Sequence, residues 1–99
     1  MNRADVLDTL KFLETPLRKR GVGSLYLFGS YARDEAKQTS DIDVFVDPVH
    51  EDSFGLMALM DSLSLIEKVF PCKKISYSTR NTIVPCYLAH IETNAIRVF

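Results

Sequence analysis

The sequence predicts an α/β fold in which helices cover a small mixed β-sheet. Two kinds of hydrophobic pattern point to this fold class. Apolar residues recur at helical spacing in residues 3–14, 52–70 and 83–98. Compact or alternating apolar residues predict strands at residues 24–28, 41–47 and 72–78. The expected order is helix, strand, short helix, strand, helix, strand, helix, and elements in such an order pack as layers around one core.

The first helical region is predicted to consist of two pieces. Residues 3–14 place their apolar side chains on one face, and Thr15-Pro16 then interrupts the pattern. Because proline is tolerated in the first turn of a helix, Thr15 could cap a second short helix with Pro16 at its first position. Gly21 follows three basic residues, which is typical of a helix end.

The two central strands carry the residues of most chemical interest. The apolar strand at residues 24–28 runs directly into Gly29-Ser30, which predicts a sharp turn into a short helix. The strand at residues 41–47 alternates, so its aliphatic side chains lie on one face. Its other face carries Asp41, Asp43, Phe45 and Asp47.

The two later helices carry more apolar residues than a single buried face requires. Asp52 or Ser53 can cap the helix at residues 52–70, and Pro71 ends it. Its Leu and Met residues are first interpreted as core, but they extend around much of the helix, which indicates an interface. Tyr87 and Phe99 suggest the same, so a partner-bound form or a homo-oligomer is expected.

Length and composition exclude several classes of protein. The chain has 99 residues and a net charge of −1, which predicts a single domain over residues 1–99 and no direct binding of nucleic acid. No apolar run approaches the ~20 residues that span a membrane. Cys72 and Cys86 fit neither a zinc site nor a disulfide framework, so reduced, half-buried thiols and a cytoplasmic protein are expected.

The Gly-Ser turn and the aspartate pair together predict a nucleotide site. Free backbone N–H groups at a helix start bind anions, Gly29 permits a phosphate to approach the backbone, and Ser30 adds a hydroxyl donor. Asp41 and Asp43 would repel each other unless a cation such as Mg²⁺ lay between them. Either feature alone has an ordinary structural explanation. Side by side, they are what a nucleoside triphosphate with Mg²⁺ requires.

The stretch GSYARDEAKQTSDIDVFVD resembles the signature of the nucleotidyltransferases related to DNA polymerase beta, and more narrowly the minimal nucleotidyltransferases of prokaryotes. In this pattern Gly-Ser is followed, after ten residues, by Asp-x-Asp, here Gly29-Ser30 and Asp41-Ile42-Asp43. The resemblance implies that Gly29 and Ser30 contact the triphosphate of ATP and that Asp41 and Asp43 hold Mg²⁺. It also implies transfer of a nucleoside monophosphate, here AMP, to a hydroxyl group of a partner protein, and an antitoxin role beside a HEPN-domain toxin.

The chain departs from this pattern at the third carboxylate. The family places an Asp on the next strand, and by register Ser76 falls there. A serine hydroxyl is a poor base and a poor Mg²⁺ ligand. Asp47 could substitute, although it lies about 13 Å along the strand from Asp43. Otherwise catalysis survives weakly, or the chain is an inactive binding module that neutralises its partner by contact.

Three further residues leave alternatives open. Lys74 could supply a positive charge near the carboxylates, although a solvated lysine is the default. Asp34 stands where the family often has Gly, so the short helix continues or the loop turns differently. Arg33 could reach a phosphate or pair with Asp34 or Glu35. The two histidines, His50 and His90, are interpreted as a solvated residue and a surface or partner-facing residue.

Overall fold

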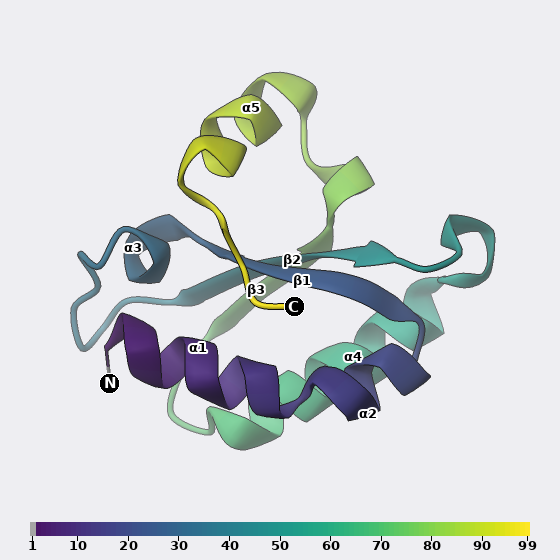
Figure 1. The fold of residues 1–99 in the computed structure, drawn as a ribbon, viewed down its shortest axis with the longest axis horizontal. Helices are drawn as coiled ribbons and strands as arrows, with labels where there is room; N and C mark the ends of the chain where they lie inside the picture. Colours follow the sequence, from purple (N-terminus) through teal and green to yellow (C-terminus); the bar gives the residue numbers. More distant parts are fainter. Residues whose placement is uncertain (1) are drawn as a thin grey trace.

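The computed structural model describes residues 2–99 and contains a four-stranded mixed sheet with helices on both faces (Figure 1). This is the predicted fold class. The elements are α1 (Arg3–Phe12), α2 (Glu14–Lys19), β1 (Val22–Phe28), α3 (Gly29–Ala32), β2 (Ile42–Pro48), η1 (Glu51–Ser53), α4 (Leu56–Val69), β3 (Ile75–Thr79), η2 (Arg80–Thr82), α5 (Pro85–Asn94) and β4 (Ile96–Arg97).

The strand order in the sheet is β3-β2-β1-β4. β2 pairs antiparallel with β1 and parallel with β3, and β4 is antiparallel to β1. This register gives the sheet two unlike faces. Leu25 pairs with Val46 on the face that meets the core, whereas Phe28 pairs with Asp43 on the opposite face.

The hydrophobic core lies between the first of these faces and helices α1, α2 and α4, which Figure 1 shows along the lower side of the sheet. The side chains of Val6, Leu10, Leu17, Val44 and Ile66 are fully buried there. Complete burial of an aliphatic side chain stabilises a fold by about 1.5–3 kcal/mol. The core therefore holds β1 and β2, which carry the predicted site residues, on a rigid base.

The N-terminal helices differ in detail from the prediction. Asn2 caps α1 in a reciprocal box, its Oδ1 accepting from the backbone N–H of Asp5 at 2.9 Å. The second helix begins at Glu14, so Thr15 is inside it and makes no cap. One residue, Leu13, both ends α1 and precedes α2. Gly21 has φ +98°, a left-handed conformation that favours glycine at a helix end.

Helix α4 begins later than predicted and buries a narrower face. Gly55 precedes its first residue, while Asp52 and Ser53 belong to the separate turn η1. Ser62 and Ile66 are fully buried. Three apolar side chains of the same helix are mainly exposed to solvent, namely Leu56, Met57 and Met60, with 71%, 77% and 54% of their surface exposed. The interpretation of these three as core is wrong, since they lie on the face turned away from the sheet.

The predicted helix at residues 83–98 ends early. α5 stops at Asn94, Ala95 is extended, and Ile96–Arg97 form the edge strand β4 beside β1. Phe99 is buried rather than available to a partner, and its backbone oxygen accepts from the N–H of Leu25 at 3.1 Å. This return of the chain to the sheet edge fixes where α5 lies.

Cys72 and Cys86 are free thiols, and both are exposed rather than half-buried as expected. Among residues 2–99, no helix has the length and apolar character needed to cross a membrane.

Candidate active site

A cleft of about 800 Å³ opens on the sheet face opposite the core. This volume lies within the ~300–1,000 Å³ typical of small-molecule sites. One part of its wall comes from the ends of the strands and from α3, through Gly29, Ser30, Arg33, Asp43 and Ser76. Helix α5, above the sheet in Figure 1, supplies much of the rest. The structure therefore brings most of the sequence-predicted site residues into one cavity.

Gly29 lies against the carboxylate of Asp43. It has φ +72°, and a Cβ atom at this position would come within 2.2 Å of Asp43 Oδ2. Only glycine satisfies both conditions, because other residues are strained at this φ and would collide with the carboxylate. Gly29 thus sets the position of Asp43, in addition to the predicted approach of a phosphate.

Ser30 follows in α3, a helix of only four residues. Its first N–H groups have no acceptor within the helix, as at every helix start. So short a helix has little macrodipole. Binding of an anion here would depend on the N–H groups and the Ser30 hydroxyl themselves.

Asp43 is a half-buried carboxylate with a perturbed pKa. Burial raises the pKa of Asp43, the nearby charge of Asp41 raises it further, and Arg33 acts in the opposite direction. Asp41 precedes β2 and is exposed, outside the residues that line the cleft. The two acids therefore interact electrostatically although they are not equivalent in position.

This pair fits Mg²⁺ as a ligand set. Mg²⁺ is commonly held by one or two carboxylates together with substrate phosphates, and a cation would remove the like-charge repulsion that Asp43 experiences. Within residues 2–99 there is no cluster of three or more His, Cys, Asp or Glu side chains able to hold a metal. Asp41 and Asp43 are therefore the candidate carboxylate donors at this site, and phosphate oxygens and water would complete the coordination.

Ser76 occupies the place beside Asp43 on the neighbouring strand. The parallel register pairs Asp43 with Ser76, and both line the cleft. A carboxylate at residue 76 would face the same cavity as Asp43. The hydroxyl that stands there can donate a hydrogen bond but cannot act as a base near neutral pH without an adjacent base.

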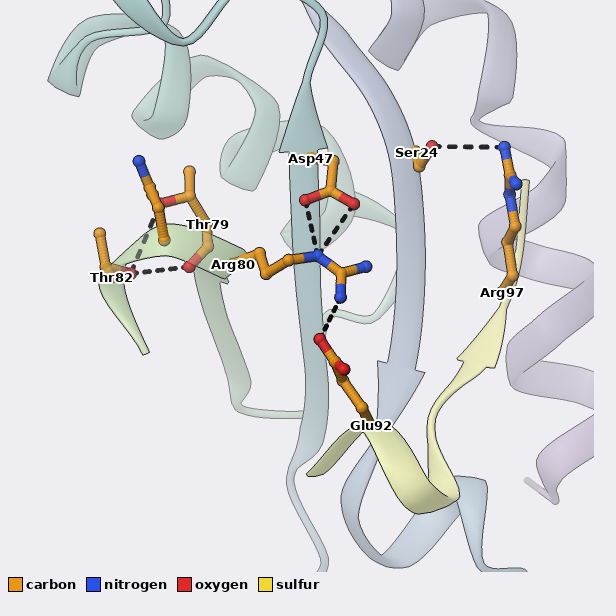
Figure 2. Close-up of polar contacts among 8 residues, drawn as sticks. Ser24, Asp47, Thr79, Arg80, Thr82, Glu92 and Arg97 are labelled. Carbon is orange, nitrogen blue, oxygen red and sulfur yellow. Dashed lines mark hydrogen bonds and ion pairs between the residues drawn. The ribbon is translucent and has the colours of Figure 1, made fainter. Parts of the chain in front are cut away.

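Asp47 forms an ion pair with Arg80 and so cannot serve as the third acid. Arg80 Nε donates to Asp47 Oδ1 at 2.8 Å and Oδ2 at 3.1 Å, and its Nη1 pairs with Glu92 of α5 (Figure 2). The guanidinium also stacks on Tyr26 and Phe45, with its Cζ 4.8 and 4.9 Å from the two ring centroids. Arg80 therefore ties α5 to β2.

Asp34, Arg33 and Lys74, whose roles the sequence leaves open, differ in how they relate to the cleft. Asp34 itself adopts φ +59°, so the left-handed turn that glycine favours is kept without glycine. Arg33 Nε lies 3.2 Å from Glu35 Oε2, an exposed pair that contributes at most about 1 kcal/mol. Arg33 also lines the cleft and is free to exchange this weak pair for an anion. Lys74 is exposed and is not part of the cleft wall.

Sequence reasoning missed the wall that α5 contributes. Ile83 precedes the helix, and Tyr87, His90, Ile91 and Asn94 follow at spacings that place them on one side of it. His90 is exposed, as predicted, but at this cavity. The spacing of Tyr87, Ile91 and Asn94 was a readable signal, although only the return through β4 reveals which surface they face.

A mixed sheet that brings a Gly-Ser turn beside the strand-borne Asp43, with Asp41 just before the same strand, is the arrangement of a nucleotidyltransferase. The chain belongs to this family, because the model of the nucleotidyltransferase domain matches residues 8–97. It is 38% identical to "Putative protein adenylyltransferase MJ0435" of Methanocaldococcus jannaschii over 86 residues, covering 83% of this chain and 85% of that protein. A second relative from the same organism, "Putative protein adenylyltransferase MJ1217", is 35% identical over 65 residues, covering 66% of this chain and 63% of that protein.

Solved structures with low sequence identity share the fold. One described as a minimal nucleotidyltransferase has a TM-score of 0.82 at 20% identity, covering 97% of this chain and 95% of that one. A toxin–antitoxin structure with AMP-PNP has a TM-score of 0.71 at 18% identity, covering 92% and 72%. A mutant MntA–HpeT toxin–antitoxin structure has a TM-score of 0.66 at 15% identity, covering all of this chain and 73% of that one.

Proposed function

We propose that this protein is a Mg²⁺-dependent adenylyltransferase that moves AMP from ATP to a hydroxyl group of a partner protein. The observation that carries the proposal is the contact of Gly29 with Asp43, which brings the Gly-Ser turn and one carboxylate of the pair together in a single cleft. Two of its relatives are named as protein adenylyltransferases, and this naming supports AMP as the transferred group.

In the proposed reaction the acceptor oxygen attacks the α-phosphorus of ATP. A new P–O bond forms to the acceptor, the bond between the α-phosphorus and the bridging oxygen breaks, and pyrophosphate leaves. Bound Mg²⁺, held by Asp41 and Asp43, would supply charge neutralisation on the phosphate oxygens. The backbone and hydroxyl of Ser30 would donate to these oxygens, and Arg33 would add a positive charge.

Ser76 limits this reaction. The acceptor hydroxyl must lose its proton, and the residue beside Asp43 cannot take it. In this proposal the proton goes to solvent, so turnover is slow unless the partner supplies a base. Because general base catalysis contributes about 10²–10⁴-fold to a rate, slow transfer is the expected result for the isolated chain.

We further propose that the partner is a HEPN-domain toxin for which this chain is the antitoxin. The resemblance to minimal nucleotidyltransferases implies this pairing, and two of the structural neighbours are toxin–antitoxin complexes. Leu56, Met57 and Met60 offer an exposed apolar surface on α4, away from the cleft. Such a surface is compatible with stable attachment to a partner.

A second candidate function is favoured by Ser76. With the third carboxylate absent, the chain could keep its fold and neutralise the partner by contact alone. The two functions differ in what they require of Asp41 and Asp43. Transfer needs both acids, whereas neutralisation by contact needs neither.

The test uses ATP labelled at the α-phosphate, Mg²⁺ and a HEPN-domain protein as the candidate partner. The proposed activity predicts label on the partner with the natural sequence and none with Asp41→Asn/Asp43→Asn. Label that persists in the double variant would refute the assignment of these acids. Neutralisation of the partner by the double variant, without label, would instead establish the contact function.

A further inference from the structure

We propose that the cleft face of α5 is a nucleobase site that selects adenine, with Tyr87 as the stacking surface and Asn94 as the group that recognises the base edge. This inference rests on the proposed function, because it concerns the same nucleotide. Residues that bind phosphates and metal cannot distinguish ATP from other nucleoside triphosphates, so selection of the base requires a separate site.

The two ends of the cleft differ in chemistry. The strand end carries Gly29, Ser30 and Asp43, which suit phosphates and a cation. The α5 end carries apolar and aromatic side chains with a single amide, namely Ile83, Tyr87, His90, Ile91 and Asn94. A nucleoside triphosphate has the same division, with a charged chain at one end and a flat, weakly polar base at the other.

Tyr87 is suited to stacking because it is not part of the core. It leaves 62% of its surface exposed although it lines the cavity. Tyrosine is intermediate in burial among residue types, and an exposed ring on a cavity wall offers a flat apolar surface that a ligand can cover. His90 lies one turn further on, its ring centroid 6.5 Å from that of Tyr87. The base would cover the exposed ring of Tyr87, with Ile83 and Ile91 closing the apolar side.

Asn94 gives the site its preference for adenine. A side-chain amide offers one acceptor and one donor side by side. At its N6/N7 edge adenine presents an amino donor next to a ring-nitrogen acceptor, whereas guanine presents two acceptors, O6 and N7, at that edge. The amide therefore matches adenine with two hydrogen bonds and leaves its oxygen facing the O6 of guanine.

The position of α5 is set in advance of binding. Arg80 holds Glu92, which lies on α5 between Ile91 and Asn94 in sequence, and also holds Asp47 of β2 (Figure 2). β4 then anchors the chain directly after the helix. A wall tied at both points is preorganised, which reduces the entropy lost on binding.

The experiment compares the binding of three ligands, each with Mg²⁺, to the full chain. ATP tests the whole site, GTP tests base selection, and inorganic tripolyphosphate tests the phosphate end alone. The variants are Tyr87→Ala, Tyr87→Phe and Asn94→Ala, with Phe12→Ala as the matched control. Phe12 is 84% exposed and lies on α1, outside the cleft. Thermal melting verifies that each variant is folded.

The inference predicts that Tyr87→Ala weakens ATP binding at least about fivefold, the loss expected when a base loses its aromatic platform. Tyr87→Phe keeps the ring and should bind ATP as the natural sequence does. Asn94→Ala should bring the affinities for ATP and GTP to within about threefold of each other. Tripolyphosphate binding should be the same in all of these proteins, and Phe12→Ala should change nothing.

The outcomes separate this inference from the proposed function. ATP binding that is unchanged in Tyr87→Ala and Asn94→Ala, but lost in Asp43→Asn, would overturn the base site and leave the phosphate and metal site standing. Equal losses of ATP and tripolyphosphate in the α5 variants would also overturn it, since α5 would then act on the whole cleft. Absence of ATP binding to the natural sequence would overturn both proposals.

Discussion

Replacement of Gly29 by alanine tests whether this glycine positions Asp43. The added Cβ would lie 2.2 Å from Asp43 Oδ2, 3.1 Å from its Cγ and 3.3 Å from its Cβ. The carboxylate oxygen must therefore retreat by at least about 1 Å to reach van der Waals contact. We expect Gly29→Ala to fold, to lose stability and to lose Mg²⁺-dependent nucleotide binding.

The size of the stability loss can be divided into two parts. An alanine held at φ +72° costs about 1–2 kcal/mol in backbone strain. Displacement of the Asp43 side chain from its rotamer costs a further ~0.5–1.5 kcal/mol. For a chain of this length each kcal/mol lowers the melting temperature by about 4–8 °C.

A double-mutant cycle separates the two parts. In an Asp43→Ala background the carboxylate is gone and only the contact with the Cβ of residue 43, at 3.3 Å, remains, so Gly29→Ala should cost little more than the backbone strain. Unfolding in urea or by heat gives the stability of the natural sequence, the two single variants and the double variant. Gly55→Ala is the matched control, since Gly55 has φ −86° and nothing lies within 4 Å of its added Cβ. An equal cost of Gly29→Ala in both backgrounds would refute the claim that Gly29 positions Asp43.

Three further predictions concern the acids and the buried hydroxyls. Folding raises the pKa of Asp43, so its charged carboxylate destabilises the folded state at neutral pH, and this destabilisation disappears as the pH falls and the carboxylate is protonated. Asp43→Asn should therefore be more stable than the natural sequence at pH 7 but not at pH 3, as denaturant titration would show. Ser76→Asp should increase the rate of AMP transfer by about tenfold or more in a single-turnover assay, because it places a carboxylate beside Asp43; an unchanged rate would contradict the role given to this position. Tyr77 donates to Ser62 Oγ at 2.8 Å, and burial raises the pKa of Tyr77 to about 12. Ser62→Ala should cost about 1–3 kcal/mol by leaving this hydroxyl unpaired, and Tyr77→Phe should recover most of that cost in the double variant, as equilibrium unfolding would show.

The central strands could be predicted because their patterns are local. Gly29-Ser30 ends one apolar strand, and the alternation from Asp41 to Asp47 assigns each side chain to a face. These two inferences need only the two-residue period of a strand. The importance of Ser76 followed instead from the resemblance, which implies a third acid on the next strand, and the structure then pairs Ser76 with Asp43.

The C-terminal part of the chain could not be predicted in the same way. Ala95 and Val98 continue the helical spacing of Ile91, yet the chain leaves the helix after Asn94 because Ile96–Arg97 gain hydrogen-bonded pairing with β1. This is a tertiary interaction that overrides the local pattern. Since β4 fixes α5, the wall of the cleft that α5 provides was equally hidden.

Helix α4 illustrates a different limit. Hydrophobic spacing alone does not say which of several apolar stripes meets the sheet. Ser62 is fully buried because its hydroxyl bonds to the backbone oxygens of Ala58 and Leu59, whereas Met57 is exposed. A polar residue with internal partners can thus occupy a core position that a Met–Leu pattern would seem to claim.

Calorimetric titration of ATP into the protein, with and without Mg²⁺, tests the central claim most directly. The natural sequence and the Asp41→Asn/Asp43→Asn variant would be compared under the same conditions. The account predicts binding that depends on Mg²⁺ and is lost in the variant, because these two acids are the only metal ligands proposed. Binding that is equally strong without Mg²⁺, or that survives in the variant, would contradict it.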